Sequence, residues 1–534
     1  MSRKTAHEPV EAAPPTPARM PRLRHAAAVF GPAVLAAVLL SWAFPRFHWH
    51  PLAWVALAPL FWRAARSAPW AAAGHFLLAG WLFHSLLLQW LAANIFWAGG
   101  WALLGQQFLC LALALFWAVC GGLWALLRQR WPRFGGPFTL GALWVVMEWC
   151  QANLFSGFGW SALGYTQGAV PAVSQWAAVG GVGLVSLLIV LVNANLALSG
   201  RKHPLRAAAA ALLLCGAFAG WFMFPLVPPP FAQFRAALVQ PMYSQEVKWD
   251  PFYAPFLLDN LDAMSRSLAG GDPAPDLIVW PEAAVPDAIP EPKAAGQLSR
   301  LSKETGAWLL TGYGRYDRET RNAYNSMLVV SPETGAGAHY DKVHLAPFGE
   351  YVPFGEYVPF LNAIAFGGVS PGKEQRLLDA AGRKLGPLVC FEVLFAPMAK
   401  KLRDMGADCL VVVTNLAWFG ASNAMTQELE IARFRAIETR LPLIHCANSG
   451  ISGVFDGYGR FTPVSARITG NGQLYRYDPD EIAPAMVQGQ RMAGVIDVPN
   501  PAERPGLRFS LAMAALLLLL WAADLTLGWR KAHA

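Results

Sequence analysis

The sequence predicts two structural parts in one chain: a polytopic α-helical membrane domain and an α/β domain with the composition of a soluble protein. Of its 534 residues, 55% are hydrophobic and only 14% are charged, whereas soluble domains usually carry about 25% charged residues. The apolar residues gather in eight stretches that are long enough, or nearly long enough, to cross a bilayer. Between residues 232 and 508 no such stretch occurs, and that region is long enough to bury a core of its own.

The eight apolar stretches divide the chain into four regions. They lie at about 26–44, 50–65, 70–98, 100–127, 137–152, 175–199, 205–227 and 509–528, and the second and fifth are short. The first run is too long, and too deeply embedded in a series of spans, to be a cleaved signal peptide. We therefore predict a disordered, Pro- and Ala-rich tail at 1–24, a seven-helix membrane domain at 25–230, the α/β domain at 231–507, and a last transmembrane helix with a short tail at 508–534.

The basic residues predict the orientation of the chain. With the N-terminus in the cytoplasm, only Arg46 falls in the outer loops, while Arg504 and Arg508 before the last span argue weakly for the opposite orientation. Eight spans then place both termini in the cytoplasm and the 231–507 domain outside it, whereas seven or nine would separate the two basic ends. The net charge of +8 is mainly a topology signal, and we expect no nucleic-acid binding. The basic residues on the inner side are Arg3, Lys4, Arg19, Arg22, Arg24, Arg63, Arg66, Arg128, Arg130, Arg133, Arg201, Lys202, Arg206, Arg530 and Lys531.

Strand-like and helical patterns alternate between 232 and 508. Runs such as FRAALVQ, DLIVWPE, NSMLVVSPE, GPLVCFE, CLVVVTN and GVIDVP predict strands. Helices are predicted at 251–268, 295–305, 395–406 and 422–440. This alternation predicts a sheet covered by helices. Glu282 and Lys342 follow strand-like segments; taken singly, each would be an ordinary turn or surface charge, but strand ends are also where α/β domains build sites.

Cys390 lies where the strand GPLVCFE passes into a helix, and three interpretations are open for it. Packing is the usual role of a buried free cysteine. A disulfide is a weaker possibility, because the chain has seven cysteines and an odd number leaves one thiol unpaired. The third interpretation is a nucleophile. Cys409 and Cys446 each lie within an apolar run, as core cysteines do, and no spacing resembles a metal site.

The three strand ends together resemble a known set of motifs. WPE at Glu282, DKVHLAPFGEYVP about 60 residues on and CFE about 48 further resemble the Glu–Lys–Cys triad of the nitrilase, or carbon–nitrogen hydrolase, superfamily. A nitrilase-like domain between seven spans and a last one resembles the apolipoprotein N-acyltransferases of bacterial inner membranes. This resemblance, which covers nearly the whole chain after the tail, implies an αββα sandwich. It also implies Glu282 as general base, Lys342 as oxyanion stabiliser and Cys390 as nucleophile.

These residue types suit acyl transfer through a covalent intermediate. A thiolate attacks well and leaves well, but a thiol with a pKa of about 8.5 needs a base or a nearby cation at neutral pH. Glu282 would take the proton and return it to the leaving group. The ammonium of Lys342, joined by the backbone N–H of Phe391, would stabilise the oxyanion.

The resemblance carries further residues into the site and also has exceptions. It implies supporting or substrate-contacting roles for Trp249, Glu350, Phe391 and Glu392. The repeat FGEYVPFGEYVP also offers Glu356, but the spacing from Lys342 favours Glu350. Trp249 could instead be a core or interface aromatic. The chain departs from the family pattern at Gln151, Pro241, Phe391 and Leu416, and in GFGW at 157–160.

The resemblance implies a two-step reaction and its partners. An acyl chain passes from phospholipid to Cys390 as a thioester, and then to the N-terminal amine of a lipoprotein carrying S-diacylglyceryl cysteine, with no cofactor or metal. The apolar, Pro- and Gly-interrupted segment 351–368 is interpreted as a loop that dips toward lipid, the alternative being a buried connector. Two other functions are open: a membrane-anchored amidase that transfers the acyl group to water, and a non-catalytic lipoprotein-binding protein.

Overall fold

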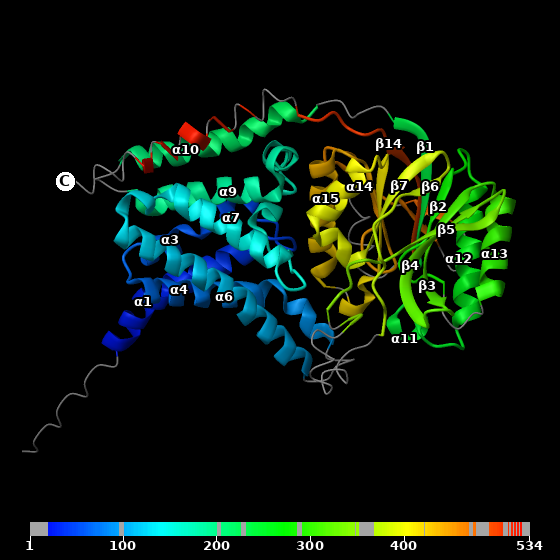
Figure 1. Ribbon diagram of the computed structural model, residues 1–534, viewed down its shortest axis with the longest axis horizontal. Helices are drawn as coiled ribbons and strands as arrows, with labels where there is room; N and C mark the ends of the chain where they lie inside the picture. Colours follow the sequence, from blue (N-terminus) through cyan, green and yellow to red (C-terminus); the bar gives the residue numbers. More distant parts are fainter. Residues whose placement is uncertain are drawn as a thin grey trace, which may run out of the picture.

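The structure is a computed structural model. It describes residues 20–94, 101–199, 204–225, 231–285, 291–347, 349–351, 368–420, 422–468, 474–476 and 491–505, and parts of 511–525 as helix. Figure 1 shows a bundle of helices beside a domain of sheets and helices. The fold class predicted from the sequence is confirmed.

The first part of the chain is a helical bundle built for an apolar surrounding. Within the described residues, five helical segments are long and apolar enough to cross a membrane, namely those in α1, α4, α6, α9 and α10. Large apolar side chains line the outside of α6: Leu104, Phe108, Leu115 and Val119 are all exposed. Their helical spacing makes one continuous stripe that faces lipid rather than core. The helices are α1 (Met20–Ala43), α2 (Ala53–Ala56), α3 (Ala58–Ala64), α4 (Pro69–Leu87), α6 (Trp101–Arg130), α7 (Pro137–Asn153), α8 (Pro171–Ser174), α9 (Ala177–Leu198) and α10 (Pro204–Phe218).

Two boundaries predicted near the N-terminus are wrong. Helix α1 begins at Met20, inside the predicted tail, because Pro21 is tolerated in the first turn of a helix. The stretch at 50–65 is not one span but the short helices α2 and α3. Pro59 opens α3, and the backbone N–H groups of Leu57 and Ala58 donate to the side-chain oxygen of Asn193 instead of continuing a helix.

Three other predicted spans differ in length or are only partly described. Helix α4 ends at Leu87, eleven residues before the predicted end at 98, and a 3₁₀ helix follows at Gln89–Asn94. Helix α7 has 17 residues, just under spanning length. The predicted last span at 509–528 lies partly outside the described residues. Its Asp524 accepts from the backbone N–H of Phe138 and pairs with Arg206, which places that segment against α7 and α10 (Figure 1).

The second part of the chain contains two mixed sheets. One has eight strands in the order β13-β12-β14-β1-β2-β3-β4-β5, and the other has six in the order β11-β10-β9-β8-β7-β6. Strands β1, β2 and β3 pair in parallel, as do β7, β8 and β9. The larger sheet contains β1 (Phe231–Gln240), β2 (Leu277–Val279), β3 (Trp308–Asp317), β4 (Asn322–Ser331), β5 (Gly335–Asp341), β12 (Ala466–Ile468), β13 (Leu474–Arg476) and β14 (Met492–Pro499). The smaller contains β6 (Leu378–Ala380), β7 (Arg383–Val389), β8 (Cys409–Thr414), β9 (Leu443–Ala447), β10 (Gly453–Phe455) and β11 (Phe461–Pro463).

Helices cover the outer face of each sheet, which completes an αββα sandwich. The larger sheet packs against α12 (Ala254–Ala269) and α13 (Glu291–Thr305), through a cluster that includes Leu261, Leu301 and Trp280. The smaller sheet is covered by α14 (Ala396–Asp404) and α15 (Ala424–Thr439) (Figure 1). These four are the helices that the sequence predicted. A short helix α11 (Gln245–Lys248) precedes α12.

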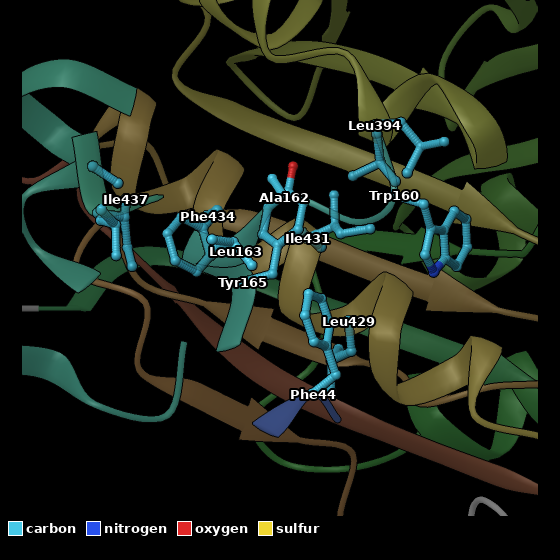
Figure 2. Packing of buried hydrophobic residues seen from close by; sticks show 14 of the residues in the cluster. Phe44, Trp160, Ala162, Leu163, Tyr165, Leu394, Leu429, Ile431, Phe434 and Ile437 are labelled. Carbon is cyan, nitrogen blue, oxygen red and sulfur yellow. The ribbon is translucent and has the colours of Figure 1, made fainter. Parts of the chain in front are cut away.

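Helix α15 lies between the smaller sheet and the helical bundle. Its Leu429, Ile431, Phe434 and Ile437 pack with residues of the bundle such as Tyr165, as Figure 2 shows. Polar groups add to the contact. The side-chain oxygen of Gln427 accepts hydrogen bonds from the indole N–H groups of Trp90, at 3.0 Å, and Trp160, at 2.6 Å. The two parts of the chain therefore share one continuous core.

Candidate active site

The three predicted triad residues follow strands of the two facing sheets. Glu282 comes three residues after β2, Lys342 directly follows β5, and Cys390 directly follows β7. Ala283 and Cys390 have φ values of 47° and 50°, a left-handed conformation that is uncommon for residues other than glycine and often marks functional sites. Cys390 and the residue next to Glu282 therefore lie at sharp turns of the chain.

Lys342 lies between two carboxylates. Its Nζ is 2.7 Å from Oε2 of Glu350 and 3.7 Å from Oε1 of Glu282. The side-chain amide of Asn325 donates hydrogen bonds of 2.8 Å to Oε1 of both glutamates. Lys342 is 1% exposed and Glu282 is 7% exposed. Because buried charges need partners, these four side chains form one interdependent cluster.

The environment shifts the titration of each charged group in the cluster. Burial raises the pKa of Glu282, the ammonium of Lys342 opposes this, and the charge of Glu350 adds to it. Burial also acts against ionisation of Glu350, but Lys342 and the backbone N–H of Ala346 outweigh it and hold the pKa of Glu350 below its ordinary value. Burial acts against the charge of Lys342 too, and the two glutamates outweigh it, so the pKa of Lys342 is raised. The cluster thus offers one carboxyl group suited to proton exchange and one persistent ammonium.

Cys390 is a free thiol next to this cluster. All seven cysteines are unpaired, so the disulfide interpretation is wrong. Burial raises the pKa of the Cys390 thiol and the charge of Glu282 raises it further, while Lys342 and a hydrogen bond with Thr414 lower it. The thiol therefore stays protonated until a base removes its proton. Glu282 is the acid whose charge acts most strongly on this thiol.

Glu392 holds the chain around Cys390 in place through four hydrogen bonds. Its Oε1 accepts from the hydroxyl of Tyr340 at 2.8 Å and from the backbone N–H groups of Val343 and His344 at 2.8 and 3.0 Å. Its Oε2 accepts from the backbone N–H of Val389 at 2.7 Å. One buried carboxylate thereby joins the chain on both sides of Lys342 to the chain just before Cys390.

The other predicted site residues lie at the rim. Phe391 is partly buried, with its ring centroid 6.5 Å from that of Phe158 in the helical bundle. Trp249 is 45% exposed and lies 6.5 Å from Trp418. Its neighbour Lys248 donates a 2.8 Å hydrogen bond to the backbone carbonyl of Glu282. Trp249 is therefore a surface aromatic close to the site, not a core residue.

Two predictions fall on residues outside the described part of the chain. Glu356 lies there, so the structure places only Glu350 of the repeated motif beside Lys342. Nearly all of the segment at 351–368 lies there as well. Within the described residues, no group of three or more His, Cys, Asp or Glu side chains is arranged to hold a metal ion.

Both parts of the chain match known family models. Residues 36–195 match the apolipoprotein N-acyltransferase N-terminal domain, and residues 235–477 match carbon–nitrogen hydrolase. The apolipoprotein N-acyltransferase of Geobacter metallireducens is 32% identical over 461 residues, which cover 83% of this chain and 88% of that protein. This chain belongs to the apolipoprotein N-acyltransferase family. The Allorhizobium ampelinum member is 37% identical over 60% of this chain and 63% of its own length. An amidase structure from Nesterenkonia sp. is 20% identical, covers 52% of this chain and 93% of its own, and gives a TM-score of 0.35.

The departures from the family pattern are structurally accommodated in this member. Leu416 is buried in a short 3₁₀ helix, Leu416–Phe419. The side-chain amide of Gln151 donates a 3.0 Å hydrogen bond to the backbone carbonyl of Leu113. Pro241 is buried at the end of β1. None of these three contacts the Glu282–Lys342–Glu350 cluster through a hydrogen bond or ion pair among the described residues.

The sequence did not reveal three residues that hold the site together: Asn325, Tyr340 and Thr414. Asn325 and Tyr340 lie within β4 and β5 among other polar or small residues, and no local pattern distinguishes them. Thr414 is the last residue of β8, and its position at a strand end was the one available signal. Only the pairing of the strands shows which side chains these residues meet.

Proposed function

We propose that this protein is an apolipoprotein N-acyltransferase that moves an acyl chain from a phospholipid to the N-terminal amine of a diacylated lipoprotein. The observation that carries the proposal is the buried Glu282–Lys342–Glu350 cluster beside the free thiol of Cys390. Family membership over both the helical and the αββα parts supports a substrate that resides in the membrane.

In the first step, Glu282 removes the Cys390 proton and the thiolate attacks the ester carbonyl carbon of the phospholipid. A C–S bond forms, and the carbonyl oxygen becomes an oxyanion that the Lys342 ammonium stabilises. The tetrahedral intermediate then expels the glycerol oxygen, which takes the proton back from Glu282. The products are a thioester at Cys390 and a lysophospholipid. The raised pKa of Glu282 suits a group that both accepts and returns this proton.

In the second step, the α-amine of the lipoprotein attacks the thioester carbonyl. Glu282 accepts a proton from the attacking nitrogen, the C–S bond breaks, and the Cys390 thiolate regains a proton. Water must be kept from the thioester, since hydrolysis would release a fatty acid. Phe391, Phe158 and His344 gather in an aromatic group beside Cys390 that limits access of water. Glu350, Glu392 and Trp249 support the step by holding or bordering the site.

Mass spectrometry of the acyl-enzyme tests the proposal. Full-length protein incubated with a phospholipid of one defined acyl chain should gain a single acyl mass on the Cys390 peptide, removable by hydroxylamine. Cys390→Ala should abolish the adduct. Cys409→Ala and Cys446→Ala are matched controls, because both thiols are buried in the sheet core. Acylation at either of those two cysteines would refute the assignment.

Adding a diacylated lipopeptide separates transfer from hydrolysis. Loss of the Cys390 adduct together with a triacylated peptide supports the transferase. Release of free fatty acid at the same rate with and without the peptide would support the amidase alternative instead.

We also propose that the protein lies in the inner membrane, with 231–507 in the periplasm and both termini in the cytoplasm. The asymmetry of basic residues in the loops supports this orientation, with 25–230 as the membrane domain and 508–534 as the last span. Single cysteines introduced at two exposed positions test it. A cysteine at Thr320, in a turn between β3 and β4, should react with an impermeant maleimide in spheroplasts, and one at Gln129, at the end of α6, should not. The reverse labelling pattern would show that the protein has the opposite orientation in the membrane.

A further inference from the structure

A second buried polar group lies near Cys390. It consists of Thr414 at the end of β8, Glu428 on α15 and His445 on β9, which are 0%, 1% and 1% exposed. None of the three belongs to the Glu–Lys–Cys triad. A carboxylate and an imidazole buried this deeply need a reason to be there, because unpaired buried charge is costly.

Strand pairing places Thr414 beside the nucleophile. Val389 of β7 pairs with Val413 of β8 in a parallel register, so the next residues along, Cys390 and Thr414, lie side by side at the carboxyl ends of the two strands. The Thr414 hydroxyl acts on the Cys390 side chain and lowers the pKa of its thiol. It also donates to Oε1 and Oε2 of Glu428, at 3.0 and 3.2 Å. A hydroxyl has a single hydrogen, so Thr414 can donate to the sulfur or to the carboxylate, but not fully to both.

His445 lies against Glu428. Its Nδ1 is 2.9 Å from the backbone carbonyl of Ile451, and since a carbonyl only accepts, Nδ1 carries a proton. In a neutral ring Nε2 is then unprotonated, and it points at Oε2 of Glu428 from 3.6 Å. Nε2 has no hydrogen-bond partner among the described residues. The hydrogen bond from Nδ1 thereby holds the ring of His445 against the carboxylate of Glu428.

The charge of Glu428 affects the ionisation of the Cys390 thiol. The charged groups that act on Cys390 are Glu282, following β2, Lys342, following β5, and Glu428 from α15. Glu282 and Lys342 have opposite signs, whereas the titratable side chain beside the Glu428 carboxylate is the imidazole of His445, at 3.6 Å. A negative Glu428 disfavours the thiolate.

We propose that Thr414, Glu428 and His445 are positioning residues that set the reactivity of Cys390. When the thiol ionises, the Thr414 hydroxyl turns from Glu428 to the sulfur, while His445 keeps the Glu428 side chain in place. No bond other than hydrogen bonds changes. The inference rests on the proposed role of Cys390 as nucleophile, but it concerns a thiol property that exists without any lipid.

The rate of Cys390 alkylation by iodoacetamide, followed against pH, tests the proposal. The full-length protein in detergent is used without lipid, and the Cys390 peptide is quantified by mass spectrometry. Glu428→Gln should move the profile to lower pH and speed alkylation at pH 7 by about 3-fold or more, because it removes a negative charge near the sulfur. Glutamine fits the site, since its oxygen can accept from Thr414 and its amide can donate to Nε2 of His445. Thr414→Val should move the profile to higher pH and slow alkylation by about 3-fold or more, whereas Thr414→Ser, which keeps the hydroxyl, should stay within about 2-fold.

Opposite shifts of the alkylation profile in the two variants distinguish a specific effect on the Cys390 thiol from a disturbed fold. A disturbed fold would expose the thiol or bury it, and would shift Glu428→Gln and Thr414→Val in the same direction. A common direction, or unchanged profiles in both, would overturn the proposal. Opposite shifts in a protein that never forms a Cys390 thioester with phospholipid would support this arrangement while refuting the proposed acyl transfer.

Discussion

Gly312 on β3 allows the chain that carries Glu282 to pass directly against the strand. The backbone N–H of Gly312 donates to the carbonyl of Pro281, and its own carbonyl accepts from Ala284 at 2.9 Å. A Cβ at Gly312 would lie 2.6 Å from the nitrogen of Ala283, 2.6 Å from the oxygen of Pro281 and 2.7 Å from Cα of Glu282. All three are backbone atoms, so no side chain can turn aside to make room. Gly312→Ala therefore displaces Glu282 itself.

The size of the displacement follows from these contacts. Ordinary carbon contacts begin near 3.5 Å, so the Glu282 segment must retreat by roughly 0.8 Å. Overpacking of this kind costs about 1–3 kcal/mol of stability, which leaves a typical domain folded. Catalysis is more sensitive, because a misplacement of about 1 Å can cost on the order of 100-fold in rate. Glu282 would lose its 2.8 Å hydrogen bond from Asn325 and its alignment with the thiol.

Formation of the Cys390 acyl-enzyme, measured over time with saturating phospholipid, is the direct assay. We expect Gly312→Ala to slow it by about 100-fold, with thermal unfolding lowered by only a few degrees. Gly296→Ala is the matched control: it lies on α13, nothing stands within 4 Å of its Cβ position, and alanine in a helix should stabilise by about 0.5–1 kcal/mol. A Gly312→Ala protein that acylates within 2-fold of wild type would show that the position of Glu282 does not govern the reaction.

Three further outcomes follow from the same cluster. Glu392→Gln should slow acylation and lower the unfolding temperature more than Tyr340→Phe, since the first weakens four hydrogen bonds and the second removes one; equal effects would contradict the proposed link. Lys342→Met should reduce the acylation rate by about 100- to 1,000-fold, the usual effect of losing one oxyanion donor; a rate near wild type would exclude that role. Glu282 must be ionised to act as base, and its pKa is raised, so activity should fall on the acid side above the ordinary glutamate range of about 4.3. Glu350→Gln removes a neighbouring negative charge and should move that acid limb to lower pH, while a shift to higher pH would contradict the assignment.

Much of the fold could be predicted because its elements carry local patterns. The apolar stretches predicted α1, α4, α6, α9 and α10, since a helix with 18 or more mostly apolar residues is long enough to cross the hydrocarbon core of a bilayer. Short strands such as β6 and β10–β13 were not predicted, because three residues give no periodicity to detect. The break between α2 and α3 depends on Asn193, more than 130 residues away, and no local pattern reports such a contact.

In the site, too, residues that belong to local motifs were predicted, and residues whose role depends on distant contacts were not. Glu282, Lys342 and Cys390 were predictable because each follows a strand and each belongs to a recognisable motif. Asn325, which bridges Glu282 and Glu350, has only its place in β4 to mark it. Its role appears once β4 is paired with its neighbours. Glu392 was predicted as a site residue, but its function as a link between two chain segments could be read only from its four donors.

Helix α15 explains why the run MTQELEIARFRAIETR carries so many charges and yet is almost wholly buried. Most helices bury one face and solvate the other, but α15 buries both, one against the sheet and one against the helical bundle. Successive residues serve the two sides: Gln427 accepts from Trp90 and Trp160 of the bundle, and Glu428 accepts from Thr414 beside Cys390. A single helix therefore joins the helical bundle to the strand end beside Cys390. Under the proposed function, the ester of a phospholipid lies at a set depth in the bilayer, and the thiol must be held at a matching depth. We infer that the contacts on the two sides of α15 supply this constraint.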